Sequence, residues 1–170
     1  VAIALGGKTR SGAAQAAVIG SGLVGSINGS AVANVASTGT FTIPMMKDRG
    51  YEPHYAGAVE SVASTGGMIM PPVMGVGAFI MSGIIGVPYA KIALCALIPA
   101  LFYYVTCGVS VHLRALRNGF KPLPDELIPN KKELFKKDGI FFLPLLAIII
   151  LLMSGTSVMR SAFLGCIVLV

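Results

Sequence analysis

The stretch GSINGSAVAN, residues 25–34, decides the fold, because it puts glycine, serine and asparagine in the middle of a long charge-free run. Residues 11–46 contain no Asp, Glu, Lys or Arg. As one helix this run would be about 54 Å long, nearly twice the ~30 Å hydrocarbon core of a bilayer, but it is short for two full crossings and a turn. Glycine and small polar residues accept and satisfy non-helical backbone, so they mark a turn between two helices.

The flanks of this run are basic on both sides. Lys8 and Arg10 come before it, and Lys47 and Arg49 follow it. Lys and Arg close to the ends of membrane segments mark the cytoplasmic side, so both flanks are expected on that side. A segment that enters and leaves on one side, and is too short for two spans, is a re-entrant helical hairpin. We predict such a hairpin over residues 11–46.

A second charge-free run, residues 61–90, contains its own interruption. Its stretch TGGMIMPP joins paired glycines to Pro71 and Pro72, and proline breaks a helix because it lacks an N–H and clashes with the preceding turn. A helix broken inside a bilayer is tolerated only where its freed backbone is buried in protein or lines a cavity. We predict a broken helix over residues 53–85, unwound at residues 65–72.

The composition agrees with a membrane protein. Of the 170 residues, 55% are hydrophobic and 12% are charged, and the mean hydropathy is +0.81. An average globular protein has about 25% charged residues, so these charges are too few to cover a water-facing domain. This excludes a soluble enzyme, a disordered tail and a disulfide scaffold. The net charge of +6 reflects basic residues on the predicted cytoplasmic side and does not indicate nucleic-acid binding.

The rest of the chain holds two further charge-free runs, each about one bilayer crossing long. The chain is therefore predicted to be an all-α integral membrane protein with several spans. Because it begins at Val1 and stops within an apolar run, we expect it to be an internal fragment of a longer polypeptide. The remaining predicted elements are a transmembrane helix at 90–116, a cytoplasmic connector at 117–138, a transmembrane helix at 139–153 and the start of a further one at 160–170.

Polar residues gather at both predicted breaks. The hairpin turn carries Ser26, Asn28, Gly29, Ser30 and Asn34, and the broken helix carries Ser64, Thr65, Gly66 and Gly67. One interpretation is ordinary packing of polar residues between membrane helices. The other is a Na⁺ and substrate site, because oxygens freed at opposed helix breaks coordinate Na⁺ while half-helix N-termini face anionic substrate groups.

Na⁺ is the only metal that we expect. It is a hard cation, so oxygens of Ser30, Asn28, Thr65 and Gly67 are its predicted ligands. No acid lies inside either break, so dipoles alone are expected to meet its charge. The residues offer no nucleophile–base pair, so we predict no catalytic residue, no enzyme activity and no cofactor besides Na⁺ as coupling ion.

Glu60 is the lone acid between residues 53 and 90. Two interpretations of this residue stay open. It is either a structural partner of His54 near the cytoplasmic interface, or an intramembrane acid that serves a proton pathway.

Two blocks of sequence are long and specific. They are GSINGSAVANVASTGTFTIPMMKDRGY, residues 25–51, and AGAVESVASTGGMIMPPVMGVGAFIM, residues 56–81. Both strongly resemble the large membrane subunit of TRAP transporters, the tripartite ATP-independent periplasmic transporters of bacteria and archaea. The resemblance covers residues 4–119 and is greatest to the fused permease type, in which small and large membrane subunits form one chain. That type is associated with TAXI-type binding proteins.

The resemblance implies an elevator-type, Na⁺-driven secondary transporter, with an ion-transporter-like fold of inverted repeats. It implies a multi-pass protein of the bacterial or archaeal cytoplasmic (inner) membrane. The implied partners are a periplasmic substrate-binding protein, a small membrane subunit (fused or separate), the lipid bilayer and a carboxylate substrate, with no nucleic acid. Carried over residue by residue, the hairpin-tip motif falls on residues 26–30 and Asn34, and the broken-helix motif on residues 64–67 with Pro71 and Pro72.

Two other classes of protein remain open. One is a channel or another secondary transporter that works without a binding protein, which the presence or absence of an inverted second hairpin and broken helix would distinguish. The other is a membrane-anchored enzyme or a purely structural membrane subunit. An enzyme would need catalytic groups that this stretch does not offer.

Overall fold

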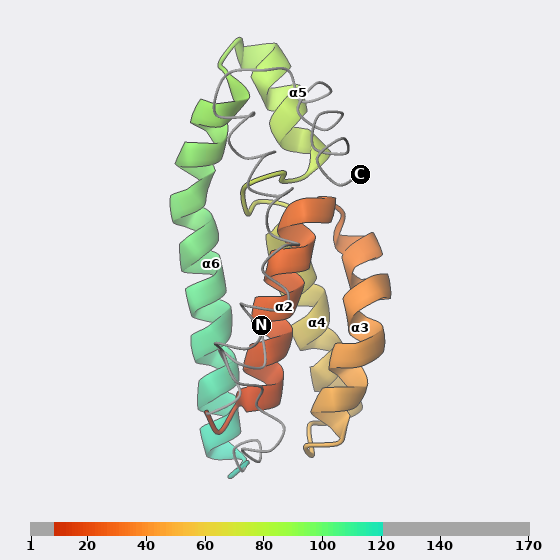
Figure 1. Ribbon diagram of the computed structural model, residues 1–170. Helices are drawn as coiled ribbons and strands as arrows, with labels where there is room; N and C mark the ends of the chain where they lie inside the picture. The colour runs from red at the N-terminus through yellow and green to blue at the C-terminus, as the bar shows by residue number, and fades with distance from the viewer. Residues whose placement is uncertain (1–8, 121–170) are drawn as a thin grey trace, which may run out of the picture.

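The computed structural model describes residues 9–120, and in that part of the chain all regular structure is α-helical (Figure 1). The predicted transmembrane segments at 139–153 and 160–170, and all but the start of the connector at 117–138, lie outside the described residues. The helices are α2 (Gly12–Asn28), α3 (Ala31–Lys47), α4 (Pro53–Gly67), α5 (Val76–Ile85) and α6 (Tyr89–Arg117).

Helices α2 and α3 form a tight hairpin and lie side by side (Figure 1). The chain turns at Gly29, which has a left-handed φ of 64°, and the hydroxyl of Ser30 caps α3 by accepting a hydrogen bond of 3.3 Å from the backbone N–H of Ala33. A side chain at Gly29 would collide with the carbonyl oxygen of Met74, so glycine is required there for space as well as for conformation. Each arm is about 26 Å long at the helical rise. The re-entrant placement of this hairpin in a membrane stays a prediction.

Helices α4 and α5 are separated by an irregular stretch, residues 68–75, which includes a cis peptide bond between Pro71 and Pro72. The predicted start of the break is wrong by three residues, because Thr65 and the two glycines after it belong to the last turn of α4. That turn closes with backbone hydrogen bonds between residues three apart, ending with Met70 N–H to the carbonyl of Gly67. Pro71 has no N–H with which to continue the series, so the helix ends where proline stops it.

Helix α6 is the longest described element, about 44 Å at the helical rise. Within residues 9–120 it is the one helix long and apolar enough to cross a bilayer by length and composition. It lies against α2 and α4, where Gly22 and Gly66 leave space for the ring of Tyr104. The hydroxyls of Tyr103 and Tyr104 each donate a 2.8 Å hydrogen bond to a backbone carbonyl of α4. Helix α5 lies beyond the hairpin tip, beside the N-terminal end of α6 (Figure 1).

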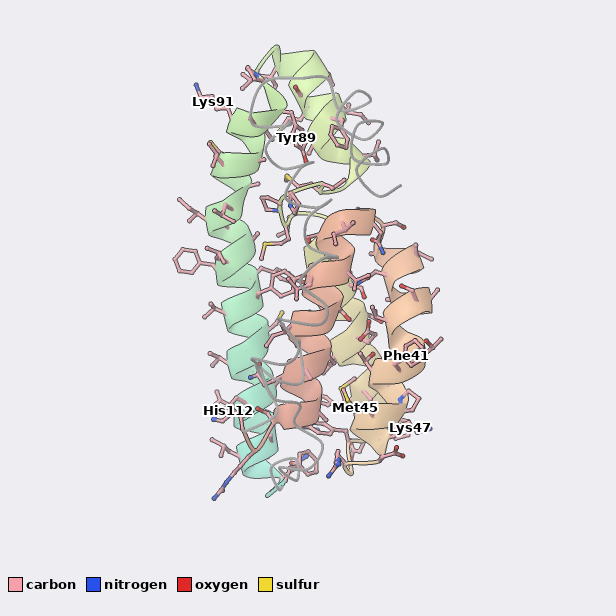
Figure 2. The ribbon with its side chains drawn as sticks, in the orientation of Figure 1. Phe41, Met45, Lys47, Tyr89, Lys91 and His112 are labelled. Carbon is pink, nitrogen blue, oxygen red and sulfur yellow. The ribbon has the colours of Figure 1, made fainter. Side chains whose placement is uncertain are left out.

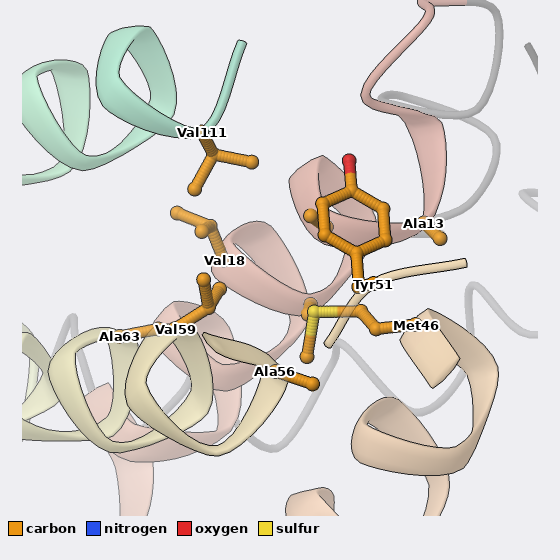
Figure 3. Packing of buried hydrophobic residues seen from close by; sticks show 10 residues of the cluster. Ala13, Val18, Met46, Tyr51, Ala56, Val59, Ala63 and Val111 are labelled. Carbon is orange, nitrogen blue, oxygen red and sulfur yellow. The ribbon is translucent and has the colours of Figure 1, made fainter. Parts of the chain in front are cut away.

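The larger hydrophobic core lies between α2, the end of α3 and the loop after it, α4 and α6 (Figure 3). Many of its residues are alanines, which let helix backbones approach closely. Tyr51, in the loop between α3 and α4, packs its ring against Phe120 at 4.3 Å between centroids. Burial, together with the neighbouring Tyr55, raises the pKa of Tyr51 to about 12, so this phenol stays neutral at physiological pH. The labelled core residues are Ala13, Val18, Met46, Tyr51, Ala56, Val59, Ala63 and Val111.

The membrane topology can be tested because exposed lysines mark both ends of the bundle. Lys47 lies at the end of α3 and Lys91 at the far end, near the start of α6 (Figure 2). If the hairpin is re-entrant, a cysteine placed at Arg10 or at Lys47 reacts with an impermeant thiol reagent only from the cytoplasmic side. A cysteine at Lys91 reacts only from the other side. Labelling of positions 10 and 47 from opposite sides would show that the segment crosses the membrane.

Candidate functional site

The carboxyl group of Glu60 is the centre of a buried polar cluster. The side chain is fully buried, with 0% of its surface exposed, and four hydroxyl groups lie within hydrogen-bond distance of its oxygens. Ser21 of α2 donates to Oε1 at 2.6 Å, Thr38 of α3 at 2.5 Å and Ser64 of α4 at 3.1 Å. Thr42 of α3 donates to Oε2 at 2.5 Å. One carboxyl group thus joins three helices.

A spacing of four residues brings these groups to one face of each helix. The cluster residues of α3 are Asn34, Thr38 and Thr42, and those of α4 are Glu60 and Ser64. Residues four apart are neighbours on a helix surface, so each set forms a short polar stripe.

Glycines bring the stripes of different helices into contact. A Cβ on Gly39 of α3 would lie 3.4 Å from Cγ of Glu60, and one on Gly67 of α4 would lie 2.6 Å from Cα of Gly25 on α2. Any larger side chain at Gly67 would therefore push α4 away from α2. The glycines fix how deeply the hairpin and α4 approach each other.

Asn34 extends the cluster from Glu60 to the hairpin tip. Its amide nitrogen donates to the backbone carbonyl of Ser21 at 2.8 Å and to the hydroxyl of Ser64 at 2.9 Å. Its amide oxygen accepts a 3.3 Å hydrogen bond from the amide nitrogen of Asn28, and the amide oxygen of Asn28 accepts one of 3.1 Å from the backbone N–H of Ser30. Asn34 is buried, whereas Asn28 and Ser30 are exposed at the tip.

The hairpin tip also contacts the break after α4. The carbonyl oxygen of Ser26, near the end of α2, accepts hydrogen bonds from the backbone N–H groups of Val73 and Met74, at 3.1 and 3.3 Å. The hydroxyl of Tyr89, at the start of α6, lies 2.9 and 2.6 Å from the carbonyl oxygens of Pro72 and Val73. Tip, break and α6 therefore meet at one junction.

Most of the sequence-predicted site residues lie at or directly below this junction. They are Ser26, Asn28, Gly29, Ser30, Asn34, Ser64 and Gly67. Thr65 does not join them: its side chain is exposed, and its hydroxyl donates to the carbonyl of Ser61 in its own helix at 2.8 Å. Gly66 lies under Tyr103 and Tyr104. The carbonyls of Gly66 and Gly67 already accept hydrogen bonds from N–H groups three residues later.

Sequence reasoning left four members of the cluster out of the predicted site, and the structure contradicts one of its two interpretations of Glu60. The other, an acid that serves a proton pathway, stays a prediction. His54 lies 3.1 Å from Glu52 and does not pair with Glu60. Six residues advance a helix by about 600°, so positions 54 and 60 point in different directions. The signal that was available is the four-residue spacing of hydroxyl side chains on α3. The four missed members are Ser21, Thr38, Thr42 and Glu60.

The chemistry of this junction is that of neutral oxygens around a single buried carboxyl group. Within residues 9–120, no group of three or more His, Cys, Asp or Glu side chains is placed to hold a metal ion. Hydroxyl, amide and backbone oxygens are suited to hard cations and to polar solutes rather than to soft or transition metals.

Close helix contacts at glycines, a polar centre built mainly from hydroxyls, and a long apolar helix are typical of a helical membrane protein. Residues 1–169 match the family model described as tripartite ATP-independent periplasmic transporter, DctM component. The chain belongs to this family, the large membrane component of TRAP transporters, as its resemblance predicted. No individual curated protein was found to match the chain.

Membership defines the broad role of the chain. It is part of the membrane permease of a TRAP transporter, an integral membrane protein of a transporter family and not of an enzyme family. The family implies a periplasmic binding protein and a small membrane subunit as partners.

The Glu60 cluster predicts a stability difference between two threonines of α3. Thr42→Val keeps the side-chain shape but removes the donor to Oε2 of Glu60, so it should destabilise the protein by about 1–3 kcal/mol. The matched control is Thr40→Val, because the hydroxyl of Thr40 is exposed and donates only to the carbonyl of Ser37. The melting temperatures of the two full-length variants, measured by thermal unfolding in detergent, give the two stability changes. Equal melting temperatures for the two variants would show that the cluster adds no stability.

Proposed function

We propose that this chain forms part of the permease of a Na⁺-driven, binding-protein-dependent secondary transporter that imports small carboxylate-bearing solutes. The observation that carries the proposal is the junction of the hairpin tip with the helix break, where exposed polar groups lie above a buried carboxyl group. Two helix interruptions that meet are the arrangement with which secondary transporters bind ions and substrates near the middle of the membrane.

The proposed Na⁺ site is centred on the hairpin tip. Asn28 and Ser30 offer exposed side-chain oxygens there, and Asn34 supports them from below. Thr65 and the carbonyl of Gly67 are weaker candidates, since the Thr65 hydroxyl donates within its own helix and Gly67 is buried against the backbone of Gly25. The N-terminal end of α3 starts at the same tip, and its partial positive charge favours a carboxylate group of the solute.

The remaining parts of the proposal concern partners and location. We propose a TAXI-type periplasmic binding protein, and a small membrane subunit that is fused or separate. The permease would lie in the cytoplasmic (inner) membrane of a bacterium or archaeon and cross it several times. Both ends of the hairpin would face the cytoplasm, which agrees with the basic residues at Arg10, Lys47 and Arg49.

Uptake by the complete transporter tests the coupling. The full permease in proteoliposomes, with its binding protein outside, should accumulate solute when an inward Na⁺ gradient is imposed, without ATP. A K⁺ gradient of the same size, and a pH gradient alone, are the controls. Uptake driven by the pH gradient in the absence of Na⁺ would contradict Na⁺ coupling. Uptake without binding protein would contradict dependence on that partner.

Two tip variants test the ion site. Asn28→Ala and Ser30→Ala each remove an oxygen at the tip, so each should raise the Na⁺ concentration for half-maximal uptake roughly fivefold or more. Thr65→Ala should have a smaller effect because its hydroxyl is bonded to Ser61. Ser37→Ala is the control, an exposed α3 hydroxyl that bonds only a backbone carbonyl. Wild-type Na⁺ dependence in both tip variants would exclude the tip as the ion site.

A further inference from the structure

The carboxyl group of Glu60 has no basic partner in the described part of the chain. The ion pairs among residues 9–120 join Glu52 to His54 and to Arg114, and none involves Glu60. A carboxylate that is fully buried is costly unless its charge is met by hydrogen bonds and an opposite charge. The four hydroxyl donors supply the hydrogen bonds. If the group is ionised, an opposite charge would have to come from outside the described basic residues.

In each hydrogen bond of the series from Glu60 to the hairpin tip, the donor lies on the side of the tip and the acceptor on the side of Glu60. The hydroxyl of Ser64 donates to the carboxylate, so its oxygen is left to accept from the amide nitrogen of Asn34. The same nitrogen donates to the backbone carbonyl of Ser21, so Asn34 turns its amide oxygen toward Asn28. Asn28 donates to that oxygen and turns its own amide oxygen to the exposed tip.

In this series of hydrogen bonds, the side chains of Ser64, Asn34 and Asn28 each direct their donor hydrogens toward Glu60 and their oxygen toward the hairpin tip. Aligned hydrogen bonds polarise one another, and they do so more strongly where water is excluded. A negative charge at Glu60 would therefore add to the polarisation of the amide oxygen of Asn28, which accepts a hydrogen bond only from the backbone of Ser30 among the described residues. A cation at the tip would find an ordered oxygen with a buried carboxylate behind it.

We infer that the carboxylate of Glu60 is the counter-charge for the coupling cation at the hairpin tip, acting through Ser64, Asn34 and Asn28. Glu60 does not touch the cation, so it is a positioning residue. This inference rests on the proposed function. It replaces the expectation that dipoles alone meet the charge of the ion, because the fold brings an acid under the tip from outside both breaks.

Glu60→Gln is the decisive variant, because it removes the charge while the cluster can keep its shape. The glutamine oxygen can accept from Ser21, Thr38 and Ser64 in place of Oε1. Its amino group then faces Thr42, whose hydroxyl has a second acceptor in the carbonyl of Thr38 at 3.0 Å. The variant is therefore expected to fold and to hold Asn34 in the same orientation.

The test compares Na⁺ affinity in the full transporter by two measurements. In proteoliposomes with binding protein, Glu60→Gln should raise the Na⁺ concentration for half-maximal uptake about fivefold or more, while uptake at saturating Na⁺ is retained. In detergent, the Na⁺ concentration that stabilises the protein against heat should rise by the same factor. Ser64→Ala, which interrupts the chain but keeps the charge, should also raise both values. Glu52→Gln, at an exposed acid, is the control and should change neither.

The outcomes separate this inference from the function on which it rests. If the wild-type protein shows neither Na⁺-dependent uptake nor Na⁺-dependent stabilisation, the proposed function is wrong. If the wild-type protein depends on Na⁺ and Glu60→Gln has the same half-saturation in both measurements, the counter-charge inference is wrong and the proposed function stands. Wild-type values for Ser64→Ala beside raised values for Glu60→Gln would contradict the hydrogen-bonded chain as the route.

Discussion

The structure depends on one buried carboxyl group and the hydroxyls that solvate it. Glu60 reaches α2 through Ser21, α3 through Thr38 and Thr42, and its own helix through Ser64. An acid without water must have its hydrogen bonds supplied by the protein, so the positions of three helices are constrained at once. If one helix slid by a turn, a donor would leave the carboxyl group. The register between the hairpin and α4 is fixed in this way.

The position of the hairpin tip follows from that register. With α2 and α4 held at Glu60, the backbones of Gly25 and Gly67 touch, and the end of α2 reaches the chain that leaves α4. The carbonyl of Ser26 then pairs with the N–H groups of Val73 and Met74 in the break. Polar backbone at a broken helix needs such partners inside the protein. The hairpin tip therefore supplies the acceptor for two N–H groups of the break, and the same hydrogen bonds hold the tip in place.

The sequence was informative where the physics is local. Charge-free lengths, basic flanks and the Gly-Ser-Asn turn predicted the hairpin, and Pro71 and Pro72 predicted the broken helix. The predicted start of the break is three residues too early because paired glycines in a sequence indicate a helix break. In the structure, Gly66 and Gly67 serve close packing inside a helix, and proline alone ends it. Local sequence does not distinguish these two uses of glycine.

The site was harder to predict because its partners are far apart in the chain. Glu60 is 39 residues from Ser21, 22 from Thr38 and 18 from Thr42. Among the sequence neighbours of Glu60, the candidate partner is His54. In the structure His54 pairs instead with Glu52 at the exposed start of α4. The face on which a polar residue lies matters in the same way: Ser64 and Thr65 are adjacent in sequence, yet only Ser64 faces the cluster.

The same interactions hold the hairpin and α4 together. Separating the hairpin from α4 would take three of its four donors from the carboxyl group of Glu60, and a buried polar group left unsatisfied costs about 1–3 kcal/mol. Thr38 and Thr42 would keep backbone carbonyls of α3 as acceptors. Helix α6 contacts α4 through the two tyrosine hydroxyls and through Val111 in the hydrophobic core, and it accepts a 2.7 Å hydrogen bond from Gln15 of α2 at the carbonyl of Gly108. The hairpin and α4 therefore form the unit of the described bundle whose helices share the most buried side-chain hydrogen bonds.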